Sequence, residues 1–146
     1  MSFSNYRNSL KNFFRFGLLL AILSVVFGAM GAHALKEVLT ESELTSFQTG
    51  VRYQFFHAIA IIFFSFFFND PGEKHSKRIL LLMSLGVSLF SFSIYALIAF
   101  KVAYQPIMSI LGPITPLGGT VLIFAWTYML IKSGDIWEKT VKKRDK

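Results

Sequence analysis

The sequence predicts an all-α polytopic membrane protein, a single domain of residues 1–146 that forms a bundle of four transmembrane helices. Of its residues, 53% are hydrophobic and only 16% are charged, whereas charged residues make up about a quarter of a soluble domain. Four runs contain no Asp, Glu, Lys or Arg, namely 16–35, 53–69, 79–100 and 102–131. A spanning helix needs about 20 predominantly apolar residues, so these runs predict four membrane crossings.

The basic residues predict the orientation of the bundle. Twelve of the 15 Lys and Arg residues lie in the two tails and in the loop between the second and third spans, which leaves Lys36, Arg52 and Lys101 for the other side. Because basic residues accumulate in cytoplasmic loops, we expect a bacterial inner-membrane protein with both termini in the cytoplasm. Ala32-His33-Ala34 also has the form of a signal-peptide cleavage site. We expect the first span to be retained because its apolar run exceeds the usual ~7–15 residues, with cleavage as the alternative.

The beginning of the chain predicts an interfacial segment followed by the first span. In residues 1–12, apolar side chains recur at helical spacing opposite Arg7 and Lys11. This pattern is typical of a short helix in the cytoplasmic interface, with a frayed start as the alternative. The first span, about 14–34, carries a stripe of small residues that lets another helix approach closely. The stripe consists of Gly17, Ala21, Ser24, Gly28 and Gly31.

The middle of the chain predicts two further spans. Thr40 and Glu43 form a capping-box pattern, from which we expect a short outer amphipathic helix that runs into the second span, about 53–69. The phenylalanines of that span are expected to face lipid (Phe63, Phe64, Phe66, Phe67 and Phe68). The third span, about 79–100, places Ser84, Ser88 and Ser91 on one face. Since no charge accompanies these hydroxyls, helix packing is favoured over a polar path.

Thr115 and Pro116 predict the start of the fourth span, about 116–132, with Thr115 as the N-cap and proline in the first helical position. Gly118 and Gly119 add a second position for close helix packing. A basic cytoplasmic tail, 138–146, follows the span. We expect the basic tails to contact anionic lipid headgroups.

Polar residues that are unusual in a membrane span fall near the predicted outer side at similar depth. They are His33, Arg52, Gln54, His57 and Thr115. Because polar residues join membrane helices, one interpretation is a structural lock between the first two helices through the two histidines. A binding site is the alternative, since ionisable groups are uncommon in membranes. No metal site is expected, because the chain has no cysteine and two histidines with Glu37 make a poor ligand set.

Three segments resemble a known family: GAHAL (31–35), FQTGVRYQFFHAIA (47–60) and LGPITPLGGTVLIFAW (111–126). They are similar to domain-of-unknown-function family 423, the small YgdD/YwdK-like bacterial inner-membrane proteins. The resemblance covers about residues 14–132 and implies four membrane helices, with no catalytic role to carry over. The matching motif residues are His33, Thr49, Gly50, Tyr53, Gln54, His57, Pro113, Thr115, Pro116, Gly118, Gly119 and Trp126.

These features together predict a non-enzymatic membrane component without a cofactor, either an accessory subunit or a lipid-organising protein. The expected partners are membrane lipids and either a second copy of the chain or another membrane protein. Nucleic acid is not expected, because the net charge of +7 is accompanied by no reading motif. The alternative is an oligomeric small-solute transporter or channel, in which the Gly/Pro-rich residues 112–119 would form a discontinuous helix.

Overall fold

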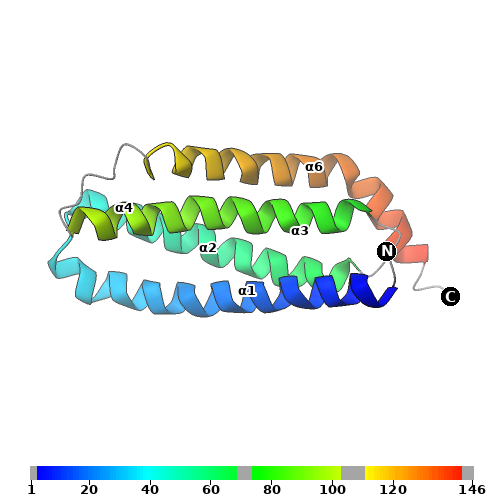
Figure 1. Ribbon diagram of the computed structural model, residues 1–146, viewed down its shortest axis with the longest axis horizontal. Coiled ribbons are helices and arrows are strands. Elements are labelled where there is room, and N and C mark those ends of the chain that lie inside the picture. The colour runs from blue at the N-terminus through cyan, green and yellow to red at the C-terminus, as the bar shows by residue number, and fades with distance from the viewer. Residues whose placement is uncertain (1–2, 69–73, 103–110, 143–146) are drawn as a thin grey trace.

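The computed structural model describes residues 3–68, 74–102 and 111–142, and its regular elements are all helical within these ranges. They are α1 (Phe3–Ala32), the 3-10 turn η1 (Ala34–Glu37), α2 (Glu41–Phe67), α3 (Lys74–Val87), the π-helical turn η2 (Ser88–Phe92), α4 (Ser93–Val102) and α6 (Ile114–Lys142). Because α3, η2 and α4 follow one another directly, the described chain forms four long rods side by side (Figure 1). Each rod contains a helical stretch that is long and apolar enough to cross a membrane, which confirms the predicted fold class.

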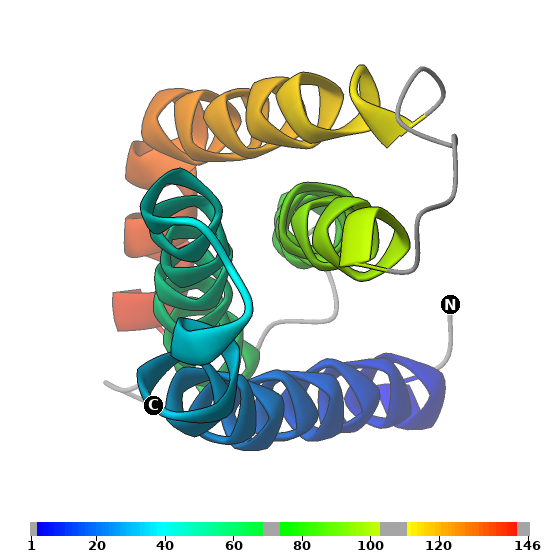
Figure 2. The ribbon, with the colours of Figure 1, turned by 90° about the vertical axis from the view of Figure 1, so that its left-hand side faces the viewer.

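The rods pack in a chain of neighbours. α1 lies mainly on α2, α2 contacts α3 and η2, and α3 packs on α6 (Figure 2). The beginning of α1 and the end of α6 lie at the same end of the bundle (Figure 1). We call the opposite end, where α1 ends and α2 begins, the η1 end. An even number of crossings requires this arrangement of the two termini.

The N-terminal segment does not form a separate interfacial helix. α1 begins at Phe3, so the described part of residues 1–12 is the start of one 30-residue helix. Tyr6 and Leu10 are buried in the core, and the Tyr6 hydroxyl donates to the carbonyl oxygen of Phe68 at 3.2 Å. The predicted helical spacing is present, but its apolar face packs on the bundle instead of on headgroups. Phe68 is likewise only 1% exposed rather than lipid-facing.

α2 is one helix from its cap to its end. The Thr40 hydroxyl accepts from the N–H of Glu43, and the Glu43 carboxylate accepts from the N–H of Thr40 at 2.8 Å, which is the predicted capping box. The expected short amphipathic helix therefore consists of the first turns of α2 itself. With 27 residues α2 is about 40 Å long, longer than the ~30 Å hydrocarbon core of a bilayer.

The third rod contains the π-helical turn η2, which the sequence analysis did not predict. Such turns insert an extra residue into a helix and are frequent at functional sites. Side-chain hydroxyls bond to one backbone carbonyl oxygen before this turn and to one within it. Ser88 donates to Ser84 at 2.7 Å, and Ser93 donates to Phe90 at 2.9 Å. Of the three serines predicted to pack, Ser88 and Ser91 bond to backbone carbonyl oxygens, whereas the buried Ser84 hydroxyl has no hydrogen-bond partner among the described residues.

α6 begins before the predicted cap. Because its first residue is Ile114, Thr115 is not the N-cap and Pro116 occupies the third helical position. The helix continues to Lys142, so the predicted tail begins as part of α6, and 143–146 lie outside the described residues. The sequence Asn69-Asp70-Pro71-Gly72, which predicts a turn at the end of the second span, also lies outside them.

The rods approach one another closely at Gly17 and at Gly86. A Cβ atom on Gly17 would lie 2.7 Å from Ile62 Cγ1 and 3.1 Å from the Ala58 carbonyl oxygen, so α1 and α2 touch there. A Cβ atom on Gly86 would lie 3.0 Å from the backbone nitrogen of Leu122, which brings α3 against α6. Gly17 belongs to the predicted stripe, whereas Gly86 was not singled out. Around these contacts lies the core cluster, which includes Ala58, Ile61, Ile79, Leu80, Met83, Val87, Leu122 and Ala125.

Candidate functional site

The five polar residues predicted to cluster do not converge on one point. His33 and Arg52 are exposed, Thr115 is half-buried, and Gln54 and His57 are buried. The hydrogen bonds of the last four lead to different helices or stay within their own helix. These side chains lie at different depths, contrary to the expectation, because His33 follows the end of α1 whereas His57 lies 16 residues, or about 24 Å, past the start of α2. They form separate contacts, and the structure offers no shared ligand set among them.

Gln54 joins α2 to α1. Its side chain is fully buried, and Nε2 donates to the carbonyl oxygen of Leu20 at 2.9 Å. The same carbonyl oxygen accepts from the Ser24 hydroxyl at 2.8 Å. The Gln54 Oε1 atom has no hydrogen-bond partner within the described part of the chain. The Gln54 side chain therefore links α2 to α1 through its N–H group only.

His57 joins α2 to α6 rather than to α1. Nε2 lies 3.1 Å from Nε1 of Trp126, and Nδ1 lies 2.8 Å from the carbonyl oxygen of Tyr53. An indole N–H can only donate, so Nε2 accepts and Nδ1 carries the proton of a neutral imidazole. The interpretation that His33 and His57 lock the first two helices is thus replaced by two links, Gln54 to α1 and His57 to α6.

Both α2 and α6 contact the π turn η2 of the third rod. The Ser91 hydroxyl donates to the Gly50 carbonyl oxygen at 2.9 Å. Since the Ser93 hydroxyl already donates to Phe90, Thr115 donates to Ser93 at 2.7 Å. A Cβ atom on Gly118 would lie 2.8 Å from Phe90 Cα, so the α6 backbone rests directly on the turn.

Sequence reasoning found the residues of α2 and α6 at this contact but missed η2. The only local signal is the spacing of Ser91 and Ser93, which puts two hydroxyls on different faces of one helix. Nothing in that spacing shows that one would reach α2 and the other α6.

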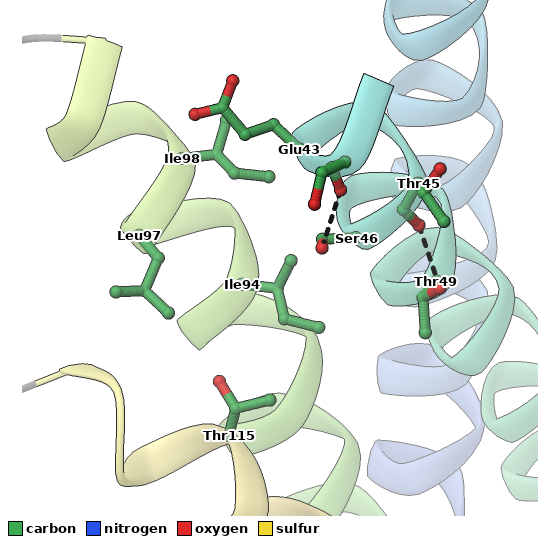
Figure 3. Close-up of a pocket in the computed structure, with 9 residues that line it drawn as sticks. Glu43, Thr45, Ser46, Thr49, Ile94, Leu97, Ile98 and Thr115 are labelled. Atoms are coloured by element: carbon green, nitrogen blue, oxygen red, sulfur yellow. Dashed lines mark hydrogen bonds between the residues drawn. The ribbon is translucent and has the colours of Figure 1, made fainter. Parts of the chain in front are cut away.

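A cleft with two unlike walls lies at the η1 end between α2 and α4, and we call it the α2–α4 cleft (Figure 3). Its volume is about 420 Å³, and it is lined by Ser42, Glu43, Thr45, Ser46 and Thr49 of α2, Ile94, Leu97 and Ile98 of α4, and Thr115 of α6. The α2 wall is polar and the α4 wall is aliphatic. Ser46 and Thr49 donate to backbone carbonyl oxygens of their own helix at 3.0 and 2.9 Å. Toward a bound molecule their hydroxyl oxygens can therefore act only as acceptors, and Thr49 Oγ1 already accepts from Nη2 of Arg52 at 3.2 Å.

The residues that line the cleft are hydroxyl-bearing and aliphatic, with one carboxylate. Glu43 is its single ionisable lining residue, and that carboxylate already caps α2. A nucleophile activated by a neighbouring base is not present among its lining residues. Within the described ranges, no three His, Asp or Glu side chains lie close enough together to hold a metal ion.

Comparison with known proteins places this site in a family. Residues 27–119 match the family described as "Protein of unknown function (DUF423)". The chain belongs to this family. The DUF423 match contains η2 and every residue that lines the α2–α4 cleft.

The DUF423 relatives extend over most of the chain. UPF0382 membrane protein YwdK of Bacillus subtilis is 34% identical over 123 residues, which cover 84% of this chain and 95% of that protein. UPF0382 membrane protein C1782.12c of Schizosaccharomyces pombe is 36% identical over 114 residues, covering 77% and 93%. No solved structure matches the chain. The names of the relatives and the four apolar helices show a multi-pass membrane protein of a family with unknown function.

Proposed function

We propose that the chain is a non-enzymatic membrane component that organises lipid by holding a lipid molecule in the α2–α4 cleft. The observation that carries the proposal is the pairing of a hydroxyl wall with an aliphatic wall at one end of a spanning bundle. A lipid presents the same pair of surfaces, a polar head and a hydrocarbon chain. The volume of about 420 Å³ falls within the range of roughly 300–1,000 Å³ of ligand pockets.

The centre of the bundle supports this function over transport by a single chain. The polar groups there bridge helices, as Gln54 does to α1 and His57 does to α6. Ala58, Met83 and Val87 fill the space between the rods and are fully buried. Transport paths are typically marked by ionisable groups or by a broken helix facing a cavity. The alternative function, an oligomeric transporter or channel, is distinguished from lipid binding by solute flux.

The lipid-holding function predicts that filling the cleft expels one lipid. In Ser46→Trp the indole replaces an exposed hydroxyl of the polar wall, so we expect one fewer lipid per chain in native mass spectra of protein released from nanodiscs. Ile123→Trp is the control, because Ile123 is 70% exposed on α6 and lies outside the cleft.

Equal lipid counts in the three proteins would contradict the proposal. If instead wild-type proteoliposomes carried a solute flux that Ser46→Trp blocked, the transporter alternative would replace it. A second copy or a partner protein retained in the same spectra would identify the accessory role.

We further propose that the chain lies in a bacterial inner membrane with both termini in the cytoplasm, which places the cleft on the outer side. The uneven division of basic residues supports this orientation. The chain has no native cysteine, so single cysteines can report it. We expect an impermeant maleimide to label Ser42→Cys in intact cells and Gly134→Cys only after permeabilisation, since both positions are exposed at opposite ends. The reverse pattern would invert the topology.

A further inference from the structure

A groove runs along the seam between α1 and α2, on a different face of α2 from the cleft. Two hollows of about 280 and 210 Å³ adjoin there and share Val51 and Arg52. A Cβ atom on Gly28 would lie 3.7 Å from Val51 Cγ1, whereas one on Gly17 would lie 2.7 Å from Ile62 Cγ1. The two helices touch near Gly17 and are farther apart at Gly28, and near the η1 end the Phe47 ring fills the seam, 3.2 Å from where a Cβ atom on Gly31 would lie.

The sides of this groove are apolar apart from Ser24, Gln48 and Arg52. The hollow of about 280 Å³ is lined by Phe27, Gly28, Gly31 and Phe47. The hollow of about 210 Å³ is lined by Val25, Phe55 and Phe56. Phe55 and Phe56 are 43% and 68% exposed, so the groove opens to the surroundings of the bundle. In a multi-pass membrane protein those surroundings are lipid, and an acyl chain is the apolar molecule at hand.

Arg52 is the one cation among the residues of the two hollows. Arg52 lies 11 residues after Glu41, which is about 16 Å along the axis of α2. The whole helix is only about 10 Å longer than the hydrocarbon layer is thick. Even if all the excess length protruded at the η1 end, the Arg52 backbone would lie inside the apolar layer. A charge at this depth is costly unless it reaches the interface or an opposite charge.

The side chain of Arg52 is turned toward the interface. Its Nη2 atom donates to the Thr49 hydroxyl at 3.2 Å, three residues nearer the start of α2. Side chains of a helix lean toward its N-terminus, and long cationic ones extend toward headgroups. Among the described residues the guanidinium has no carboxylate partner, and most of its five N–H donors are left for another acceptor.

We propose that this groove binds an anionic phospholipid of the surrounding membrane, with the lipid phosphate on Arg52 and one acyl chain along the α1–α2 seam. The inference rests on the proposed lipid-organising function and names the lipid class and a second place where the chain holds lipid. Guanidinium and phosphate form charge-assisted hydrogen bonds. Charge complementarity favours an anionic lipid over a zwitterionic one, because no headgroup cation then offsets the attraction of the phosphate to Arg52. The small residues of α1 leave the room for the chain.

The test is native mass spectrometry of protein released from nanodiscs that contain phosphatidylglycerol and phosphatidylcholine in equal amounts. We expect the wild-type chain to retain phosphatidylglycerol preferentially, and Arg52→Gln to lower that preference about tenfold, the loss of one strong charge-assisted contact. Lys36→Gln is the matched control, since Lys36 is an exposed cation at the same end that lines neither hollow. Gly28→Leu keeps Arg52 and fills the groove, so it should lower retention of the same lipid.

Two results would overturn the inference: an unchanged phosphatidylglycerol preference in Arg52→Gln, or an equal loss in Lys36→Gln. If the preference is unchanged while Ser46→Trp still loses one lipid, the groove proposal fails and the lipid-organising function stands. If Ser46→Trp loses none while Arg52→Gln loses the anionic lipid, the cleft fails and the groove stands. The melting temperature of each variant, measured alongside, shows that it is folded.

Discussion

Replacing Gly118 with alanine is expected to lower the free energy of unfolding by at least about 3 kcal/mol, the upper part of the range for overpacking. The added methyl would meet the backbone nitrogen of Phe90, lie 2.8 Å from Phe90 Cα and lie 2.9 Å from the carbonyl carbon of Leu89. These atoms belong to the π turn and cannot rotate aside, so α6 must move away from the third rod. Reversible unfolding in mixed micelles, followed by circular dichroism, measures the loss.

Gly119→Ala is the matched control for this prediction. A Cβ atom there would lie 3.6 and 3.7 Å from Phe90 ring carbons, which is ordinary van der Waals contact. We expect its free energy of unfolding to stay within about 1 kcal/mol of wild type, the scale of the helix-propensity difference between glycine and alanine. Equal effects of the two substitutions would show that α6 does not rest on η2.

Replacing His57 with alanine is expected to cost about 2–4 kcal/mol of unfolding free energy, through lost packing and a Trp126 N–H left without its acceptor. In a double-mutant cycle, His57→Phe and Trp126→Phe should couple by about 0.5–1.5 kcal/mol, the range for hydrogen bonds between membrane helices. The same micelle unfolding experiment measures each step.

His33→Ala separates this link from a lock between the two histidines. His33 is exposed at the end of α1, so we expect its removal to change the stability by less than about 0.5 kcal/mol. A loss as large as that of His57→Ala, together with no coupling between His57 and Trp126, would favour the lock that the sequence suggested.

The features predicted correctly from the sequence are those that local chemistry determines. Charge-free runs must be helical in a bilayer, because a membrane segment has to satisfy its own backbone hydrogen bonds. The cap at Thr40 depends only on Glu43, three residues away. Gly17 was recognised because small residues recur along one face of its helix.

The features that were missed depend on contacts between distant segments. The apolar face of residues 3–12 could meet headgroups or protein, and only the position of Phe68, 62 residues after Tyr6, decides in favour of protein. His57 could face α1 or α6 until Trp126 is placed beside it. The π turn has no amino-acid signature of its own. Its neighbours Gly50, Thr115 and Gly118 come from α2 and α6, which are distant in the sequence.

Nuclear Overhauser contacts in nanodiscs, with methyl-labelled isoleucine, leucine and threonine, would show directly whether the α2–α4 cleft holds lipid. We expect contacts from lipid acyl protons to the methyl groups of Ile94 and Ile98, and from glycerol or headgroup protons to those of Thr45 and Thr49. Contacts from water alone to both walls would mean a hydrated cleft, as a transporter requires, and would contradict the claim.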